Sequence, residues 1–167
     1  MSSAPFDPLR VLQVLQEHHV RFVMIGGLAA RVWGSPTVTN DLDICYARDA
    51  SNLSALARAL KVLGARLRGV DAPVPFLLDG ATLRAGDHFT FETDAGDLDI
   101  IGVPAGTRGY DELVRTAETL DLGGLQVAVT SLDDLIEMKR AAGRPKDRIE
   151  LEVLGAVREE RRRLEET

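Results

Sequence analysis

The sequence has few of the features that mark secreted, zinc-binding and membrane-spanning proteins. Its one cysteine, Cys45, excludes an internal disulfide, and no group of cysteines and histidines has the spacing of zinc ligands. The first residues lack the basic and apolar regions of a signal peptide, and no apolar run approaches the ~20 residues that a membrane helix needs. We therefore expect a cytoplasmic protein in a reducing compartment, with no membrane partner.

Positive charge is also scarce in this chain. Its 167 residues include 20 Lys and Arg against 26 Asp and Glu, which gives a net charge of −6. This balance argues against a protein held to nucleic acid mainly by a broad basic face, but a nucleic acid can still visit a local site. Hydrophobic residues make up 45%, as in globular proteins, and no linker divides the chain. We predict a single domain over 1–167.

The pattern of apolar residues predicts alternating helices and strands, and hence an α/β or α+β fold. Residues 131–167 are expected to form a C-terminal helical segment. Residues 65–87 have no clear period and include two prolines, so we expect only a strand and a turn or two there. Helices are predicted over 8–18, 28–33, 51–63, 110–117, 131–142 and 146–166, and strands over 21–25, 41–46, 88–93, 97–103 and 125–129.

The most informative stretch is a glycine pair followed by two spaced aspartates. Gly26 and Gly27 come directly after a predicted strand and before a predicted helix, where a backbone without side chains can approach a ligand closely. The free N–H groups of a helix start suit a phosphate. Asp41 and Asp43 are separated by one residue on a predicted strand, so both carboxylates point to the same side.

Two carboxylates that lie so close repel each other unless a cation sits between them. Oxygen ligands alone favour Mg²⁺ or Mn²⁺ over zinc. A third acid is expected in such a site, and the predicted strand over 97–103 offers Asp97 and Asp99 on one face. We prefer Asp99, because the two isoleucines after it place it deeper in the strand. Asp97 comes one residue after the predicted turn, so we expect it at the solvent-exposed end of the strand.

The glycine pair, Thr39, Asp41-x-Asp43 and Asp99 resemble the nucleotidyltransferase superfamily of the DNA polymerase β type, in its minimal bacterial branch. More narrowly, they resemble the AbiEii-type toxin and related nucleotidyltransferase-like proteins. The segment over 131–147, a helix followed by a basic break and a Lys-Asp pair, is similar to the C-terminal signature of this branch. The resemblance covers about residues 20–154, and it implies a mixed sheet with the acids on one side and packed helices.

The resemblance also implies roles for individual residues. Asp41, Asp43 and Asp99 would hold Mg²⁺ or Mn²⁺ ions, and Asp99 could also accept the proton of the acceptor hydroxyl. Gly26 and Gly27 would bind phosphate oxygens, while Thr39 would either donate its hydroxyl to a phosphate or brace the loop. The expected catalytic residues are Asp41, Asp43, Asp99 and Lys139, and the expected nucleotide-binding residues are Gly26, Gly27, Thr39, Lys139, Arg144 and Lys146.

The implied function is metal-dependent transfer of a nucleotide from a nucleoside triphosphate to an acceptor hydroxyl. RNA such as a tRNA 3′ end, a protein or a small molecule could be the acceptor, and residues 65–87 are expected to shape that side. The family analogy favours a toxin with a cognate antitoxin. Two alternatives stay open, an enzyme that modifies an antibiotic and an inactive module that only binds a nucleotide or a partner. In this family a serine often follows the glycine pair, but this chain has Leu28 there. The missing hydroxyl is the reason to consider the inactive module.

Overall fold

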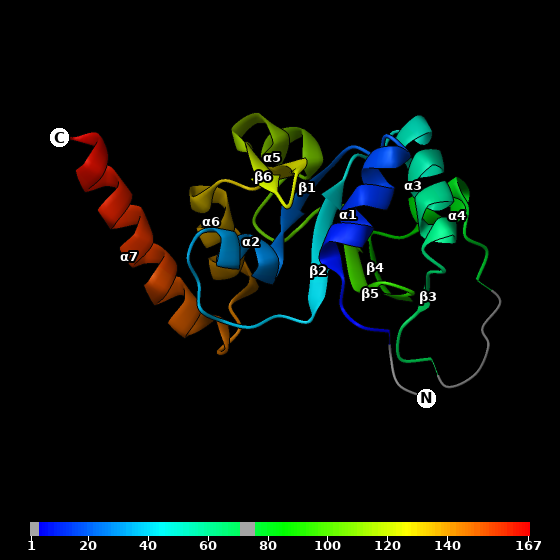
Figure 1. Cartoon of the computed structure of the whole chain (residues 1–167), viewed down its shortest axis with the longest axis horizontal. Coiled ribbons are helices and arrows are strands. Elements are labelled where there is room, and N and C mark those ends of the chain that lie inside the picture. The colour runs from blue at the N-terminus through cyan, green and yellow to red at the C-terminus, as the bar shows by residue number, and fades with distance from the viewer. Residues whose placement is uncertain (1–3, 71–75) are drawn as a thin grey trace.

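A mixed sheet of seven strands, in the order β3-β4-β5-β2-β1-β7-β6, runs through the molecule (Figure 1). The structure is a computed structural model that describes residues 4–70 and 76–167. Strand β2 pairs in parallel with β5, and β1 pairs in parallel with β7, whereas the other neighbours are antiparallel. This arrangement confirms the predicted mixed sheet. The strands are β1 (Phe22–Ile25), β2 (Asp41–Tyr46), β3 (Arg66–Leu67), β4 (His88–Thr93), β5 (Gly96–Ile101), β6 (Glu118–Leu122) and β7 (Leu125–Val129).

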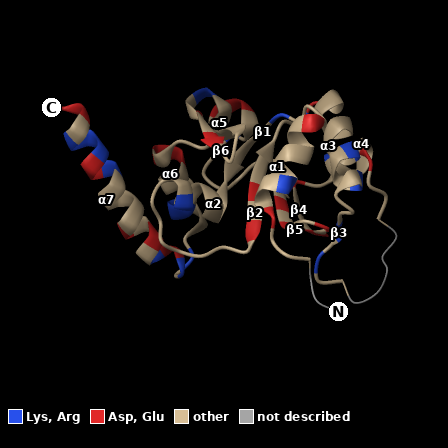
Figure 2. Ribbon diagram, viewed as in Figure 1, with Lys and Arg blue, Asp and Glu red and all other residues tan. Residues whose placement is uncertain are grey.

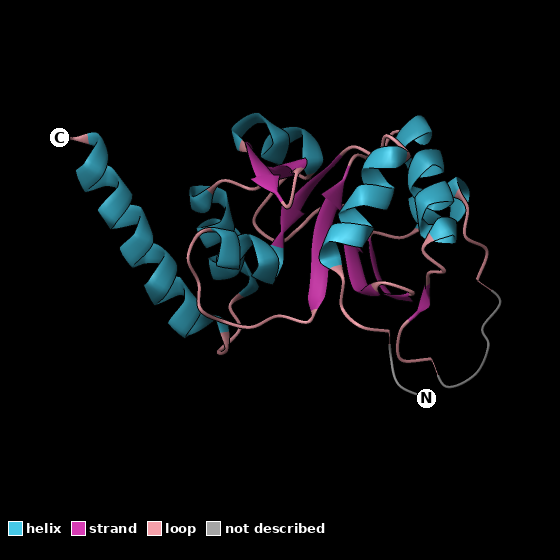
Figure 3. Cartoon of the chain, viewed as in Figure 1, coloured by secondary structure: helices cyan, strands magenta, loops and turns pink. Residues whose placement is uncertain are grey.

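Most of the helices lie beside this sheet in two groups, and Figure 3 distinguishes helices from strands by colour. Helices α1, α3 and α4 gather near β2, β4 and β5, whereas α2, α5 and α6 lie near β1, β6 and β7 (Figure 1). Within the described residues, no helix is long and apolar enough to cross a membrane. The helices are α1 (Pro8–Glu17), α2 (Gly26–Val32), α3 (Ala50–Val62), α4 (Gly80–Ala85), α5 (Tyr110–Thr116), α6 (Leu132–Ala142) and α7 (Asp147–Glu165).

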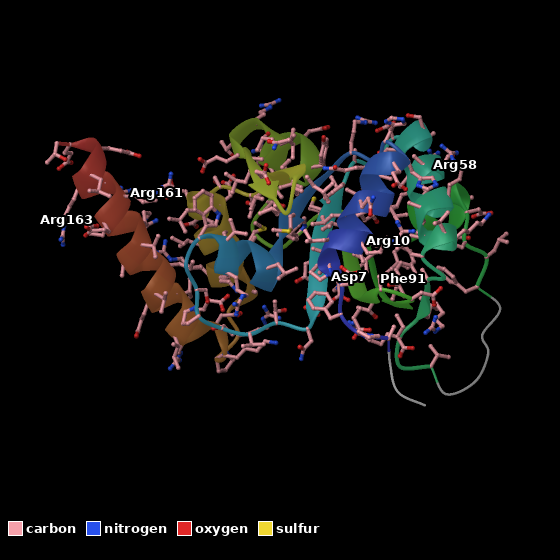
Figure 4. All side chains as sticks on the ribbon, viewed as in Figure 1. Asp7, Arg10, Arg58, Phe91, Arg161 and Arg163 are labelled. Atoms are coloured by element: carbon pink, nitrogen blue, oxygen red, sulfur yellow. The ribbon has the colours of Figure 1, made fainter. Side chains whose placement is uncertain are left out.

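Local sequence signals explain where two of these helices begin and end. The Asp7 side chain accepts a hydrogen bond from the backbone N–H of Arg10, one turn into α1, and Pro8 occupies the first helical position (Figure 4). Gly64 follows the end of α3 with φ +66°, the left-handed conformation that glycine adopts easily after a helix. Both helices lie close to their predicted ranges.

Alternation along β2 and β5 separates an apolar face from an acidic one. Leu42, Ile44, Leu98 and Ile100 are fully buried, while the aspartates between them stay partly exposed on the opposite face. Burying four branched side chains contributes several kcal/mol to folding, roughly 1.5–3 kcal/mol for each. The core therefore fixes the register that holds the acids together on one side of the sheet.

The structure differs from the predicted elements in three places. Helix α2 begins at Gly26 rather than at 28, so the glycine pair forms the first helical turn instead of a loop before it. Strand β6, with half-buried residues alternating with exposed ones, was not predicted. Residues 65–87 contain β3 and α4, and the part of this prediction that falls on 71–75 lies outside the described residues.

Candidate active site

Three carboxylates converge on the polar face of two neighbouring strands. Asp41 and Asp43 lie on β2, and Asp99 lies on β5 directly beside Asp43 in the parallel register. One oxygen from each side chain can be chosen so that all three lie within 4.8 Å of one another, and all three residues are partly buried. In Figure 2 the acidic end of β2 lies beside the acidic part of β5. The three residues, named the acidic triad below, could bind a metal ion.

The glycine pair lies directly against the triad. Ile25, the last residue of β1, is the register partner of Asp43, so the chain turns into α2 beside that carboxylate. Gly26 has φ +73°, and a Cβ there would lie 2.7 Å from Asp43 Cγ. Gly27 is packed against Thr39, whose hydroxyl donates to Asp41 Oδ1 at 3.0 Å. Only glycine fits at 26, and Thr39 braces one acid of the triad.

The electrostatics of the triad show how much repulsion is concentrated there. Burial raises the pKa of Asp43 to about 7, with further increases from the charges of Asp41 and Asp99, while the Gly27 N–H opposes the shift. Burial also raises the pKa of Asp99, and the charge of Arg68 partly offsets this effect. A divalent cation would remove the repulsion, and an all-oxygen donor set suits Mg²⁺ or Mn²⁺. The side chains present therefore fit the metal that the sequence resemblance implies.

Sequence reasoning missed one residue at this site, Arg68. Its guanidinium donates to Asp99 Oδ1 at 2.7 Å and contacts Asp97 Oδ2 at 3.2 Å. Asp97 is thus the ion-pair partner of an arginine, outside the triad. Arg68 follows the short strand β3, in the stretch without apolar periodicity, so no pattern marked it in the sequence. Its backbone N–H donates to Thr90 of β4 at 3.0 Å, which extends the β3–β4 pairing to this residue.

The basic residues near the C-terminus form a different cluster. Lys139 of α6 is buried and contacts Glu150 and, at 3.6 Å, Asp147, both on α7. Arg144 Nε also binds Asp147, at 2.8 Å, whereas Lys146 is exposed. None of these basic residues is an ion-pair partner of the triad in the described part of the chain. Their nucleotide-binding roles stay predictions.

This cluster also reaches the loop that leads to the triad. The Ser35 hydroxyl donates to Glu150 Oε2 at 3.2 Å, and the backbone N–H of Thr37 donates to Ser35 Oγ at 3.3 Å. Lys139 and Glu150 therefore connect α6 and α7 to the loop that precedes Thr39 and β2. These hydrogen bonds give the cluster a structural role: it holds the loop before β2 in place without a bound nucleotide.

We expect Lys139→Met to lower the free energy of unfolding by about 3 kcal/mol, because it leaves Asp147 and Glu150 buried without their shared cation. Chemical denaturation measures this change. Arg140→Met is the control, since the one ion-pair partner of Arg140 among residues 4–70 and 76–167 is the exposed Glu137 on the same helix. Its loss should cost no more than about 0.5 kcal/mol. A Lys139→Met protein of normal stability with a raised KM for the triphosphate would instead support the predicted nucleotide contact.

Trp33 is a packing residue rather than a free aromatic surface. Its indole N–H donates to the carbonyl oxygen of Thr130 at 2.9 Å, and the guanidinium of Arg161 lies 4.6 Å from its ring centroid. Figure 4 labels Arg161 on α7. These contacts hold Trp33 against Thr130 and Arg161, so it anchors the end of the short helix α2.

Comparisons with known proteins address the fold. No protein-family model and no curated protein matches the sequence. TM1012 from Thermotoga maritima, a candidate nucleotidyltransferase, is 16% identical with a TM-score of 0.52, and the match covers 98% of both chains. Lincomycin-bound LnuA, a lincosamide antibiotic adenylyltransferase, is 12% identical with a TM-score of 0.59, covering 90% of this chain and 95% of that one. ANT(2")-Ia in complex with adenylyl-2"-tobramycin is 17% identical with a TM-score of 0.53, covering 92% and 95%.

These likenesses extend over nearly the whole chain, at identities that establish the fold alone. They do not address the narrower resemblance to the AbiEii-type toxin, which stays a prediction. The mixed sheet agrees with the fold that the superfamily resemblance implied, and the roles of the glycine pair and the triad stay predictions. The chain therefore has the nucleotidyltransferase fold.

Proposed function

We propose that this protein is a metal-dependent nucleotidyltransferase that moves a nucleoside monophosphate from a nucleoside triphosphate to an acceptor hydroxyl. The convergence of Asp41, Asp43 and Asp99 carries the proposal, because three carboxylates within 4.8 Å of one another repel, and a divalent cation between them would remove that repulsion. The similarity in fold to two adenylyltransferases supports the same reaction class. Repulsion within a partly buried cluster of acids without a bound cation would lower the stability of the fold.

Each group of residues at the site would have a separate role in such a transfer. The triad would hold the divalent ions, which would stabilise the negative charge that develops on the phosphates. Gly26 and Gly27 present backbone without side chains beside the triad, so a phosphate can come close. Asp99 would accept the proton of the acceptor hydroxyl. The acceptor oxygen then bonds to the α-phosphorus, the bond from that phosphorus to the bridging oxygen breaks, and pyrophosphate leaves.

A cavity near Asp41 provides the argument about the acceptor: among its lining residues, Asn40 precedes Asp41 in the chain and Asp97 is the register partner of Asp41. It has a volume of about 480 Å³, lies against Asn40 and Asp97 at the amino ends of β2 and β5, and also contacts Phe6, Arg66 and Glu92. This volume is in the range of small-molecule sites. With two acids and one arginine, the cavity suits a neutral or cationic molecule better than a polyanion.

We therefore favour a small hydroxyl-bearing molecule as the acceptor over RNA or a protein. The lincomycin and tobramycin named for two similar structures are ligands of this class. The toxin role, a cognate antitoxin and an RNA acceptor rest on the sequence resemblance alone. Mg²⁺ or Mn²⁺ is the proposed cofactor, and a cytoplasmic location stays an expectation.

Incorporation of labelled nucleotide tests the function directly. The full chain would be incubated with each α-labelled triphosphate and Mg²⁺, together with lincomycin, tobramycin or total RNA, and labelled products would be separated by size. We expect a labelled small molecule, no label without Mg²⁺, and none with Asp43→Asn. Label on RNA would replace the proposed acceptor class while keeping the reaction. Triphosphate binding without transfer to any acceptor would favour the inactive binding module.

A further inference from the structure

Arg68 connects the triad to the acid that lies outside it. Asp97 and Asp99 point to one face of β5 with a single residue between them, so their Cα atoms are about 7 Å apart. The guanidinium of Arg68 spans the gap, with one nitrogen 2.7 Å from Asp99 Oδ1 and the other 3.2 Å from Asp97 Oδ2. The side chains of Arg68 and Asp99 are 28% and 14% exposed, so solvent screens this contact only in part.

This contact places a fixed positive charge where the proposed metal must also bind. Among the described residues, the Arg68 guanidinium is the one ion-pair partner of the acids on β2 and β5, and it pairs with the two on β5, Asp97 and Asp99. A divalent ion held by the triad takes an oxygen of Asp99 and so lies within a few ångströms of that guanidinium. The two cations repel each other, and both attract the same carboxylate.

We propose that Arg68 is a positioning residue that orients Asp99 through one carboxylate oxygen and competes with a divalent ion for that carboxylate. This inference rests on the proposed metal-dependent transfer. The site without nucleotide then binds a free metal ion weakly, and the phosphate oxygens of the triphosphate complete the binding. Loading of the metal is therefore coupled to loading of the nucleotide.

Arginine suits this role better than lysine would. Its planar guanidinium offers several N–H groups in a fixed geometry, so it can hold two carboxylates at once. Lysine keeps the charge but acts as a point donor, and it would hold either Asp97 or Asp99. The two properties of Arg68, its charge and its bridging geometry, can thus be separated by substitution.

Binding of Mn²⁺ to the full chain without nucleotide tests the inference, with free Mn²⁺ measured by electron paramagnetic resonance. Removing a unit charge from a few ångströms of a divalent ion in a partly solvated site changes its affinity by about tenfold or more. We expect Arg68→Gln to bind Mn²⁺ about tenfold more tightly than the wild type. We expect its kcat to fall by roughly a hundredfold, because Asp99 loses its orientation.

Two further variants separate charge from geometry. Arg68→Lys should bind Mn²⁺ like the wild type and show an intermediate kcat. Arg163→Gln is the control: Arg163 forms an exposed ion pair with Glu160 on the same helix, α7, so neither quantity should change. Tighter metal binding together with slower transfer is a combination that a merely structural role would not produce.

Unchanged or weaker Mn²⁺ binding by Arg68→Gln, in a protein that unfolds at the wild-type temperature, would overturn the inference. If Arg68→Gln does not fold, a wild-type kcat in Arg68→Lys would overturn the bridging role. Absence of Mn²⁺ binding in both the wild type and Arg68→Gln, with and without a triphosphate, would overturn both the inference and the proposed function. If the expected affinity changes occur without any nucleotide transfer, the competition stands and the proposed transfer fails.

Discussion

At pH 8, Asp43→Asn should lose nucleotide transfer by about a thousandfold, the scale expected when an electrostatic contribution to the transition state is removed. Asp43 lies in the centre of the triad, between Asp41 on its own strand and Asp99 on the next. An amide supplies a neutral oxygen where the proposed metal needs a charged ligand. Transfer measured with saturating Mg²⁺ and triphosphate checks the loss, and normal activity of the variant would contradict the metal assignment.

The same substitution should stabilise the metal-free protein. The pKa of Asp43 is about 7 in the folded chain, against an ordinary value of 3.8. Between these values the folded chain keeps a proton that the unfolded chain has lost, so this group makes stability fall as the pH rises from about 4 to 7. Above pH 7 the cost is complete, and it amounts to roughly 2 kcal/mol or more. Asparagine at this position removes that cost.

Thermal unfolding in the presence of EDTA at pH 5 and pH 8 measures this effect. The wild type should lose more stability between the two values than Asp43→Asn does, although the raised pKa of Asp99 leaves a slope in both proteins. Added Mg²⁺ should raise the unfolding temperature of the wild type at pH 8 and leave that of the variant almost unchanged. Equal responses of the two proteins to Mg²⁺ would show that the ion binds elsewhere.

Much of the triad could be predicted from the sequence because it depends on local patterns. Asp41 and Asp43 alternate with Leu42 and Ile44, so burial of the leucine and isoleucine forces both acids to one face. The same logic places Asp99 between two buried residues of β5. Pairing of the two strands in register, Asp43 beside Asp99, then requires only that the strands be neighbours.

The parts that could not be predicted depend on contacts between distant segments. Arg68 reaches Asp99 across two strand pairings, from a stretch whose own sequence has no period. The prediction for Lys139 took account of basic neighbours in sequence, whereas its ion-pair partners are the buried acids Asp147 and Glu150 on the next helix. The sequence pattern around a helical lysine is the same whether its side chain contacts a ligand or a buried carboxylate.

Gly26→Ala should reduce transfer almost as much as Asp43→Asn. Gly26 has φ +73°, which alanine adopts only at a cost of about 1–2 kcal/mol, and the new Cβ would lie 2.7 Å from Asp43 Cγ. The Asp43 side chain would have to move out of the triad, because the Gly26 backbone is held between β1 and α2. We expect weaker Mn²⁺ binding, lost transfer and a lower unfolding temperature.

Gly124→Ala separates the backbone cost from the effect on the site. Gly124 also has a positive φ, +92°, but a Cβ there would meet nothing within 4 Å, and the residue lies in the turn between β6 and β7. Its replacement should lower stability by a similar amount while Mn²⁺ binding and transfer stay at wild-type levels. If Gly26→Ala matched Gly124→Ala in all three measurements, the glycine would serve only the turn into α2. The close approach of backbone to Asp43 would then have no part in the chemistry.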